Sequence, residues 1–279
     1  MLSRFLSFLL LALLVMVFPQ VSPAQGRETV ESIMKKGFEG RTLVLKTPYV
    51  EDKLHFDSQQ HLIGVSEIGP WTTRAWIRVN QLELKDNRLR IEGNRTILVL
   101  DRQSSSSGFV PLLSGEKVQI TFDLTASDQA AAAMLPVFDT QPVQSRMATY
   151  WTPILDLSKD LAVLRNESAD RVAGVLEGNR QVFLGDASIG LQPPRAIKTP
   201  DPNYPPEARH NHLAGDDGLV VVINEQGFPE VLEVKKAGER FFDESALRAV
   251  SRWRFKPATK DGKAVAVVIN VVVTFRYPN

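Results

Sequence analysis

The side chains most able to do chemistry are few, and none of them stands in a catalytic pattern. His210 and His212 form a His-x-His pair that could hold a metal ion. A protein zinc site takes three or four ligands, and no cysteine or nearby group of carboxylates completes one here. The alternative is a pair of solvated loop histidines. His55 and His61 lie in or beside expected strands, where a single histidine is usually structural, so we predict neither a metal nor a cofactor.

Composition narrows the function classes further. Serine, histidine and aspartate are all present, but no G-x-S-x-G or H-E-x-x-H motif positions them, so we do not expect an enzyme. The absence of cysteine excludes disulfides, thiolate metal sites and cysteine nucleophiles. With 33 basic and 32 acidic residues, the chain lacks the basic surplus that nucleic-acid binding requires.

The first 24 residues are typical of an export signal. Arg4 precedes an apolar run from Phe5 to Phe18, and small residues at Ser22 and Ala24 flank a proline. A membrane-spanning helix needs about 20 apolar residues, and this run is shorter. We predict a signal peptide cleaved after Ala24, with retention as an inner-membrane anchor as the alternative. Both place the rest of the chain in the periplasm.

Residues 25–190 predict a β-rich domain. A short amphipathic helix is expected between Gly26 and Gly37, followed by strands over 42–45, 53–56, 62–65, 75–84, 88–92, 96–100 and 117–124. Asp86-Asn87 and Gly93-Asn94 have the residue types of tight turns, since Asn, Asp and Gly tolerate positive φ. These features predict an antiparallel sheet or small barrel, with helices near 128–134 and 168–177.

Three tryptophans fall in this middle domain. Trp71, Trp76 and Trp151 could line a ligand groove or fill the core, and tryptophan is mostly buried on average. The groove is the basis of two alternatives, a ligand-binding domain and, less strongly, an enzyme.

A second domain follows a proline-containing linker at 191–203, which should resist both helix and sheet. In the domain itself, 204–279, prolines open a short helix after Tyr204. Two strands joined by a turn at Gly227 come next, then a helix capped by Asp243 with Ala246, Leu247, Val250 and Trp253 on one face. Residues 264–276 predict a closing strand about twice the usual length.

These motifs together resemble the C-terminal domain of the TonB family. The resemblance covers residues 196–279 and follows the family's order and spacing. It rests on Tyr204-Pro205, Gly218, Gly227, Phe242 to Ala246, Arg252 to Pro257, Gly262 and the valine-rich strand to Phe275. It implies a two-layer module, a three-stranded antiparallel sheet packed on helices, so the whole chain is expected to be α+β.

The resemblance also implies a way of binding. In the family, the TonB box of an outer-membrane receptor adds as a strand beside the last strand, and residues near the Tyr-Pro motif touch the receptor plug. Carried onto this sequence, the partner-binding residues are Asn203, Tyr204, Pro205, Val267, Ile269, Val271, Val273 and Phe275. The expected partner is a TonB-dependent receptor or another envelope protein, and a second copy could pair through the same strand.

Two features depart from the family pattern. Family members have an uncleaved membrane helix bearing a histidine, but the apolar run here contains none. They also have a long proline-rich linker, whereas 192–203 extends only about 3.1 Å per residue even as polyproline II. A role as energy transducer in transport is therefore carried by the resemblance alone. The alternative is an envelope ligand-binding or scaffold protein that uses this domain for assembly.

Overall fold

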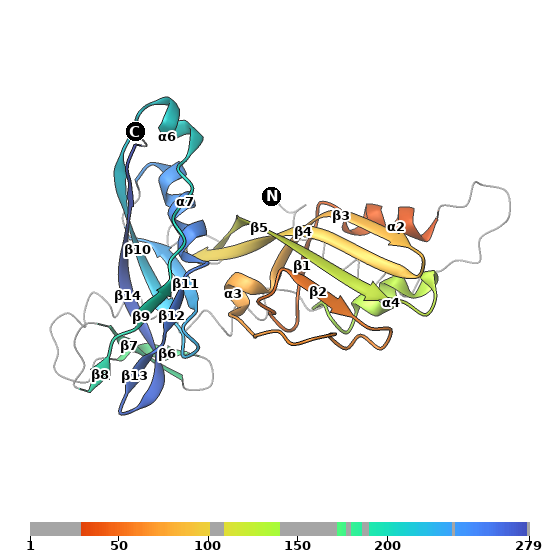
Figure 1. The fold of residues 1–279 in the computed structure, drawn as a ribbon, viewed down its shortest axis with the longest axis horizontal. Helices are drawn as coiled ribbons and strands as arrows, with labels where there is room; N and C mark the ends of the chain where they lie inside the picture. The colour runs from red at the N-terminus through yellow and green to blue at the C-terminus, as the bar shows by residue number, and fades with distance from the viewer. Residues whose placement is uncertain are drawn as a thin grey trace. The chain divides into compact units, whose positions relative to one another are not determined.

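The computed structural model describes residues 29–100, 109–139, 172–176, 180–185, 190–235 and 238–277. They fall into two compact units (Figure 1), one containing residues up to Thr96 with Leu113–Val143, the other Ile97–Leu112 with Gln144–Asn279. The chain is mixed α+β, mostly sheet with few helices, as predicted. The predicted signal peptide and Trp151 lie outside the described residues. Within the described ranges, no helix has both the length and the apolarity to cross a membrane.

The first unit contains most of the N-terminal strands. The elements are α2 (Val30–Phe38), β1 (Thr42–Val44), β2 (Lys53–Phe56), α3 (Trp71–Arg74), β3 (Trp76–Lys85), β4 (Arg88–Leu100), β5 (Phe109–Asp123), η2 (Ser127–Gln129) and α4 (Ala130–Met134). The last residues of β4 and the first residues of β5 belong to the second unit. The strand pairs include β1 with β3 and β3 with β4, both antiparallel. β2 pairs with β5 in parallel, which the antiparallel prediction missed.

Aromatic and branched side chains fill the core of the first unit. Phe56 of β2 stacks on Phe122 of β5 with ring centroids 5.2 Å apart. Trp76 is buried, and Trp71 meets it edge-on at 5.1 Å, so these two tryptophans pack against each other. This arrangement favours the core interpretation over a ligand groove for that pair.

Of the two predicted tight turns, the structure forms one. Asp86 and Asn87 have φ of 50° and 54° and close the β3–β4 hairpin, as predicted. Gly93-Asn94 is not a turn, because β4 runs straight through it. A Cβ on Gly93 would lie 2.4 Å from the Arg78 carbonyl oxygen, beside an irregularity in the β3–β4 register. Gly93 therefore permits a close strand approach at a bulge.

Two further element predictions are wrong. The segment 62–65 contributes only an isolated bridge from Leu62 to Phe56, since bends follow at once. In the described part of the helix expected at 168–177, residues 172–176 instead form the strand β6 (Val172–Leu176), which pairs antiparallel with β7 (Arg180–Leu184). Pairing with a neighbouring strand overrides weak local helix propensity there.

The second unit is built around a three-stranded antiparallel arrangement. β10 (Gly215–Ile223) lies between β11 (Pro229–Val234) and β14 (Lys263–Phe275). Additional strands extend it, so the sheet is larger than the predicted three strands. The remaining elements are β8 (Leu191–Gln192), β9 (Arg195–Lys198), α6 (Pro206–His210), α7 (Arg240–Val250), β12 (Arg254–Lys256) and β13 (Ala258–Lys260). The proline-containing segment thus holds two short strands, and β9 pairs with β12.

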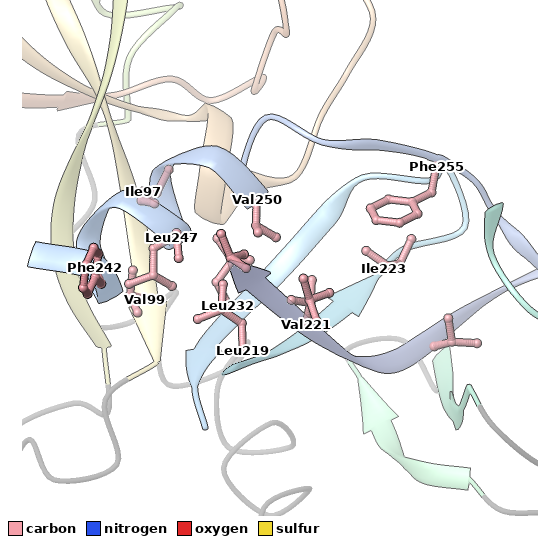
Figure 2. Packing of buried hydrophobic residues seen from close by; sticks show 14 of the residues in the cluster. Ile97, Val99, Leu219, Val221, Ile223, Leu232, Phe242, Leu247, Val250 and Phe255 are labelled. Atoms are coloured by element: carbon pink, nitrogen blue, oxygen red, sulfur yellow. The ribbon is translucent and has the colours of Figure 1, made fainter. Parts of the chain in front are cut away.

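The helix α7 packs on the inner face of this sheet. Figure 2 shows Leu247 and Val250 of α7 among side chains of the sheet, including Leu219 and Leu232. Ile97 and Val99 at the end of β4 join the same buried cluster. Residues far apart in the sequence therefore share one core, as burial of apolar surface requires.

The ends of α7 differ from the prediction. Its N-cap is Glu239, and Asp243 lies in the first turn, where its Oδ1 accepts a hydrogen bond from the Gly238 amide at 3.3 Å. The helix ends at Val250, before Trp253. The Trp253 ring instead packs partly buried against the core, and its Nε1 donates to the Pro200 carbonyl at 3.1 Å. This bond fastens the segment that precedes the domain's first helix.

Candidate partner-binding edge

The strand β14 is bordered on only part of its length. Along one side, residues 267–275 pair with β10 throughout. The start of β14 forms a hairpin with β13, and on the side away from β10 Ala266 to Val268 pair in parallel with β7. Among the described residues, no strand pairs with that side from Ile269 to Phe275. In the described part of the chain, this stretch is a sheet edge of about seven residues without a pairing strand, which we call the open edge, and it is long enough to template another strand.

The strand β7 covers β14 only as far as Val268. Arg180 at its start makes ion pairs with Glu230 at 2.5 Å and Glu225 at 3.2 Å, which tie β7 to the β10–β11 hairpin. At its end, the Gly185 amide donates to the Val268 carbonyl at 3.0 Å. A Cβ at Gly185 would lie 2.9 Å from Ile269 Cγ2. The end of β7 is therefore in close contact with β14 up to Ile269, where the open edge begins.

Two hydrogen bonds reveal which main-chain groups face outward. The Val268 carbonyl points to β7, and the direction of the main-chain N–H and C=O groups alternates along a strand. The main-chain groups of Asn270, Val272 and Thr274 therefore also point away from β10. Independently, the Lys235 amide bonds the Gly218 carbonyl, so Gly218 points to β11. Val272 is opposite Gly218, so its main-chain groups must point away from β10 as well. Both observations assign the outward main-chain groups to the even-numbered residues.

The side chains of these three residues lie on the solvent side of the sheet. Asn270, Val272 and Thr274 are exposed, and Val272 is 67% exposed despite being apolar. No residue from Ala264 to Phe275 is ionisable. An added strand would therefore meet free N–H and C=O groups in an uncharged setting, with alternate side chains accessible for recognition.

The strand residues that the sequence predicted as partner-binding are the odd-numbered ones, whose side chains face the core. Val267, Val271, Val273 and Phe275 are buried in the core, and Ile269 is partly buried against it. Their main-chain groups are directed at β10. They hold the strand in place, whereas the groups available to a partner belong to the even-numbered residues between them. A period-two alternation with polar Asn270 and Thr274 is the sequence signal that points to the even-numbered residues.

The Tyr-Pro segment lies at the same end of the domain as Phe275. Pro205 is buried, and the exposed Asn203 uses its carbonyl to accept a hydrogen bond from Ser245 of α7. The Tyr204 hydroxyl donates to the Leu213 carbonyl. The ring of Tyr204 meets Phe242 edge-on at 6.3 Å, and Phe242 lies 4.6 Å from Phe275. The structure thus joins both predicted groups through one aromatic cluster.

This cluster also contains Tyr277, which the sequence did not single out, and His212, which the sequence offered as a possible metal ligand. Tyr277, just after β14, lies 6.3 Å from Tyr204, and the His212 ring packs on it at 4.6 Å. His212 has φ of 52°, a left-handed conformation that ends the turn after α6. Within the described ranges, no group of three or more possible metal ligands includes this histidine. Its observed contact is aromatic stacking.

The comparisons bear on this part of the chain. Residues 200–277 match the model of the Gram-negative bacterial TonB protein C-terminal family. The chain carries a TonB C-terminal domain. Protein tonB2 of Pseudomonas aeruginosa is 33% identical over 81 residues, which are 29% of this chain and 30% of that protein. The chain therefore spans less than a third of that relative's length.

A solved structure is also similar to this chain. It is the solution NMR structure of the Pseudomonas aeruginosa TonB C-terminal domain, with 24% identity and a TM-score of 0.28. The match covers 31% of this chain and 88% of that structure. Residues 200–277, which match the family model, contain the open edge and the Tyr-Pro segment.

Proposed function

We propose that this protein is a non-enzymatic binding protein of the cell envelope. In the periplasm, its TonB C-terminal domain would accept an extended segment of a partner along Ile269–Phe275 of β14. The observation that carries this proposal is the row of outward main-chain groups at Asn270, Val272 and Thr274, with no pairing strand among the described residues. A TonB-dependent outer-membrane receptor is the partner that the family match favours.

The chemistry of such an edge suits recognition of a flexible segment. Each main-chain hydrogen bond contributes about 1 kcal/mol net, so several are needed for useful affinity. Selectivity would come from the side chains beside Val272 and from the aromatic cluster around Tyr204 at the end of the strand. The roles predicted for residues 25–190, ligand binding or scaffolding, stay predictions.

The substitution Val272→Pro tests the edge directly. Proline removes the outward N–H but leaves the hydrogen bonds to β10 intact, and edge strands tolerate proline when that N–H faces solvent. We expect binding of a labelled TonB-box peptide to weaken at least about tenfold, which is about 1.4 kcal/mol. Fluorescence anisotropy on the full chain measures the affinity, and circular dichroism checks the fold.

Two variants serve as controls. Val272→Thr keeps the N–H and the β-branched shape and should bind nearly as the wild type does. Val271→Pro removes a donor that β10 uses, so it should lower the melting temperature as well as binding. Wild-type affinity in the Val272→Pro variant would rule out strand addition at this edge. If a dimer instead dissociates on this substitution, the edge serves a second copy of the chain.

A further inference from the structure

A buried carboxyl group lies beneath the end of the sheet that carries the open edge. Asp217 of β10 is opposite Val273 of β14 and is only 3% exposed. Both of its carboxylate oxygens are buried, and neither forms a hydrogen bond of ordinary length and angle with a described residue. Leaving an ionised carboxylate in such a place is costly. The site therefore favours the protonated form of the carboxyl over the ionised one.

The neighbour that Asp217 faces is a second carboxyl group. Asp243 lies in the first turn of α7, above the face of β10 that carries Asp217 and Leu219. Burial raises the pKa of Asp217 to about 7, and the charge and the facing carboxyl of Asp243 act in the same direction, whereas the Gly218 amide acts in the opposite direction. Two carboxyls within hydrogen-bonding reach cannot both ionise cheaply, but they can share one proton.

Other charged groups also lie on the elements that pack around this pair. Lys235 of β11 directs its Nζ to Asn270 at 3.3 Å, and Arg240 of α7 pairs with Glu244 at 3.0 Å. Asp216 is exposed, and β14 has no ionisable residue from Ala264 to Phe275. The remaining charged groups nearby on these elements are Glu233 of β11, Glu239 at the N-cap of α7 and Arg248 one turn further along α7.

We propose that Asp217 and Asp243 bind one proton between them, and that this proton holds the first turn of α7 on the sheet beneath the open edge. The link to partner binding rests on the proposed function. Phe242, next to Asp243, packs on Phe275 at the end of β14 and on Tyr204. Loss of the proton leaves two facing negative charges, which loosens this aromatic contact. The domain then binds its partner more tightly below neutral pH than above it.

The direction of the stability change follows from linkage. The folded chain holds the proton between pH 3.8, the ordinary value for an aspartate, and about 7, whereas the unfolded chain releases it. The free energy of unfolding therefore falls as the pH rises through this interval. The melting temperature of the wild type should decline from pH 5 to pH 8. Asp217→Asn, which needs no proton, should flatten that decline, and the exposed neighbour Asp216→Asn should leave it unchanged.

Carboxyl carbon-13 NMR on the full chain tests the proton site itself. We expect Asp217 to titrate at least two pH units above Asp216, and Asp243→Asn to lower the midpoint of Asp217. The amides of Phe242 and Val273 should shift with the midpoint of Asp217. Titration of Asp217 together with Asp216, or a midpoint that Asp243→Asn does not lower, would overturn the proposal.

Peptide binding tests the link to the edge. Affinity for the TonB-box peptide at pH 6 should exceed that at pH 8 by about threefold or more, and Asp217→Asn should remove the difference. Equal pH dependence in wild type and Asp217→Asn would reject the link while strand addition stands. If no peptide binds at either pH, the proposed function fails and the link with it, whereas the NMR titration still decides whether the carboxyls share a proton.

Discussion

Replacement of Gly227 by alanine is expected to destabilise the C-terminal unit by more than about 3 kcal/mol. Gly227 turns the chain between β10 and β11 with φ of 82°. A Cβ there would lie 1.8 Å from the Phe255 carbonyl oxygen, so backbone must move. The Phe255 amide also donates to the Gly227 carbonyl at 2.9 Å, and Phe255 is part of the core. The strain would therefore reach the packing of the whole unit.

Gly262 provides a matched control. It has φ of 77° in the β13–β14 hairpin, but a Cβ there meets nothing within 4 Å. Gly262→Ala should cost only the conformational penalty, about 1 kcal/mol. Hydrogen exchange of the amides from 215 to 234 in the full chain measures both effects. Equal costs for the two variants would mean that the close contact at Gly227 is not present.

Replacement of Arg95 by methionine should destabilise the first unit by about 3–5 kcal/mol. Arg95 is 1% exposed, and its guanidinium donates to the main-chain carbonyls of Arg74, Tyr49, Val50 and Glu51. Burial lowers its pKa to about 10, with the charge of Arg74 contributing, so the group is still charged at neutral pH. Methionine fills similar space but leaves these acceptors without their donor.

Arg90→Met on the same strand is the control for Arg95. Its side chain is 45% exposed and lies 4.0 Å from Glu83, so its loss should change stability by less than about 0.5 kcal/mol. Urea denaturation monitored by the fluorescence of Trp71 and Trp76, which report on the first unit, gives both values. A small effect of Arg95→Met would show that water or other donors replace the guanidinium.

Local sequence patterns predicted the elements whose signal is strong along the chain. The two strands joined at Gly227, the Asp86-Asn87 turn and the prolines that open α6 all lie where propensity and backbone restriction placed them. The patterns failed where another segment decided the outcome. Gly93 was predicted to form a turn, but it lies within β4, where the close approach of the Arg78 main chain needs a glycine. Residues 172–176 form a strand because they pair with β7.

The sequence also predicted only part of the candidate site. The sequence by itself indicated a TonB-like domain that begins with a Tyr-Pro motif and ends in a long, uncharged strand, because residue type and spacing carry that information locally. Only the tertiary structure decided that β7 covers the strand up to Val268 and that Asn270, Val272 and Thr274 offer the outward groups. It also brought Asp217 against the helix bearing Asp243. Strand pairing and burial depend on residues distant in the chain, and no local pattern encodes which of them will meet.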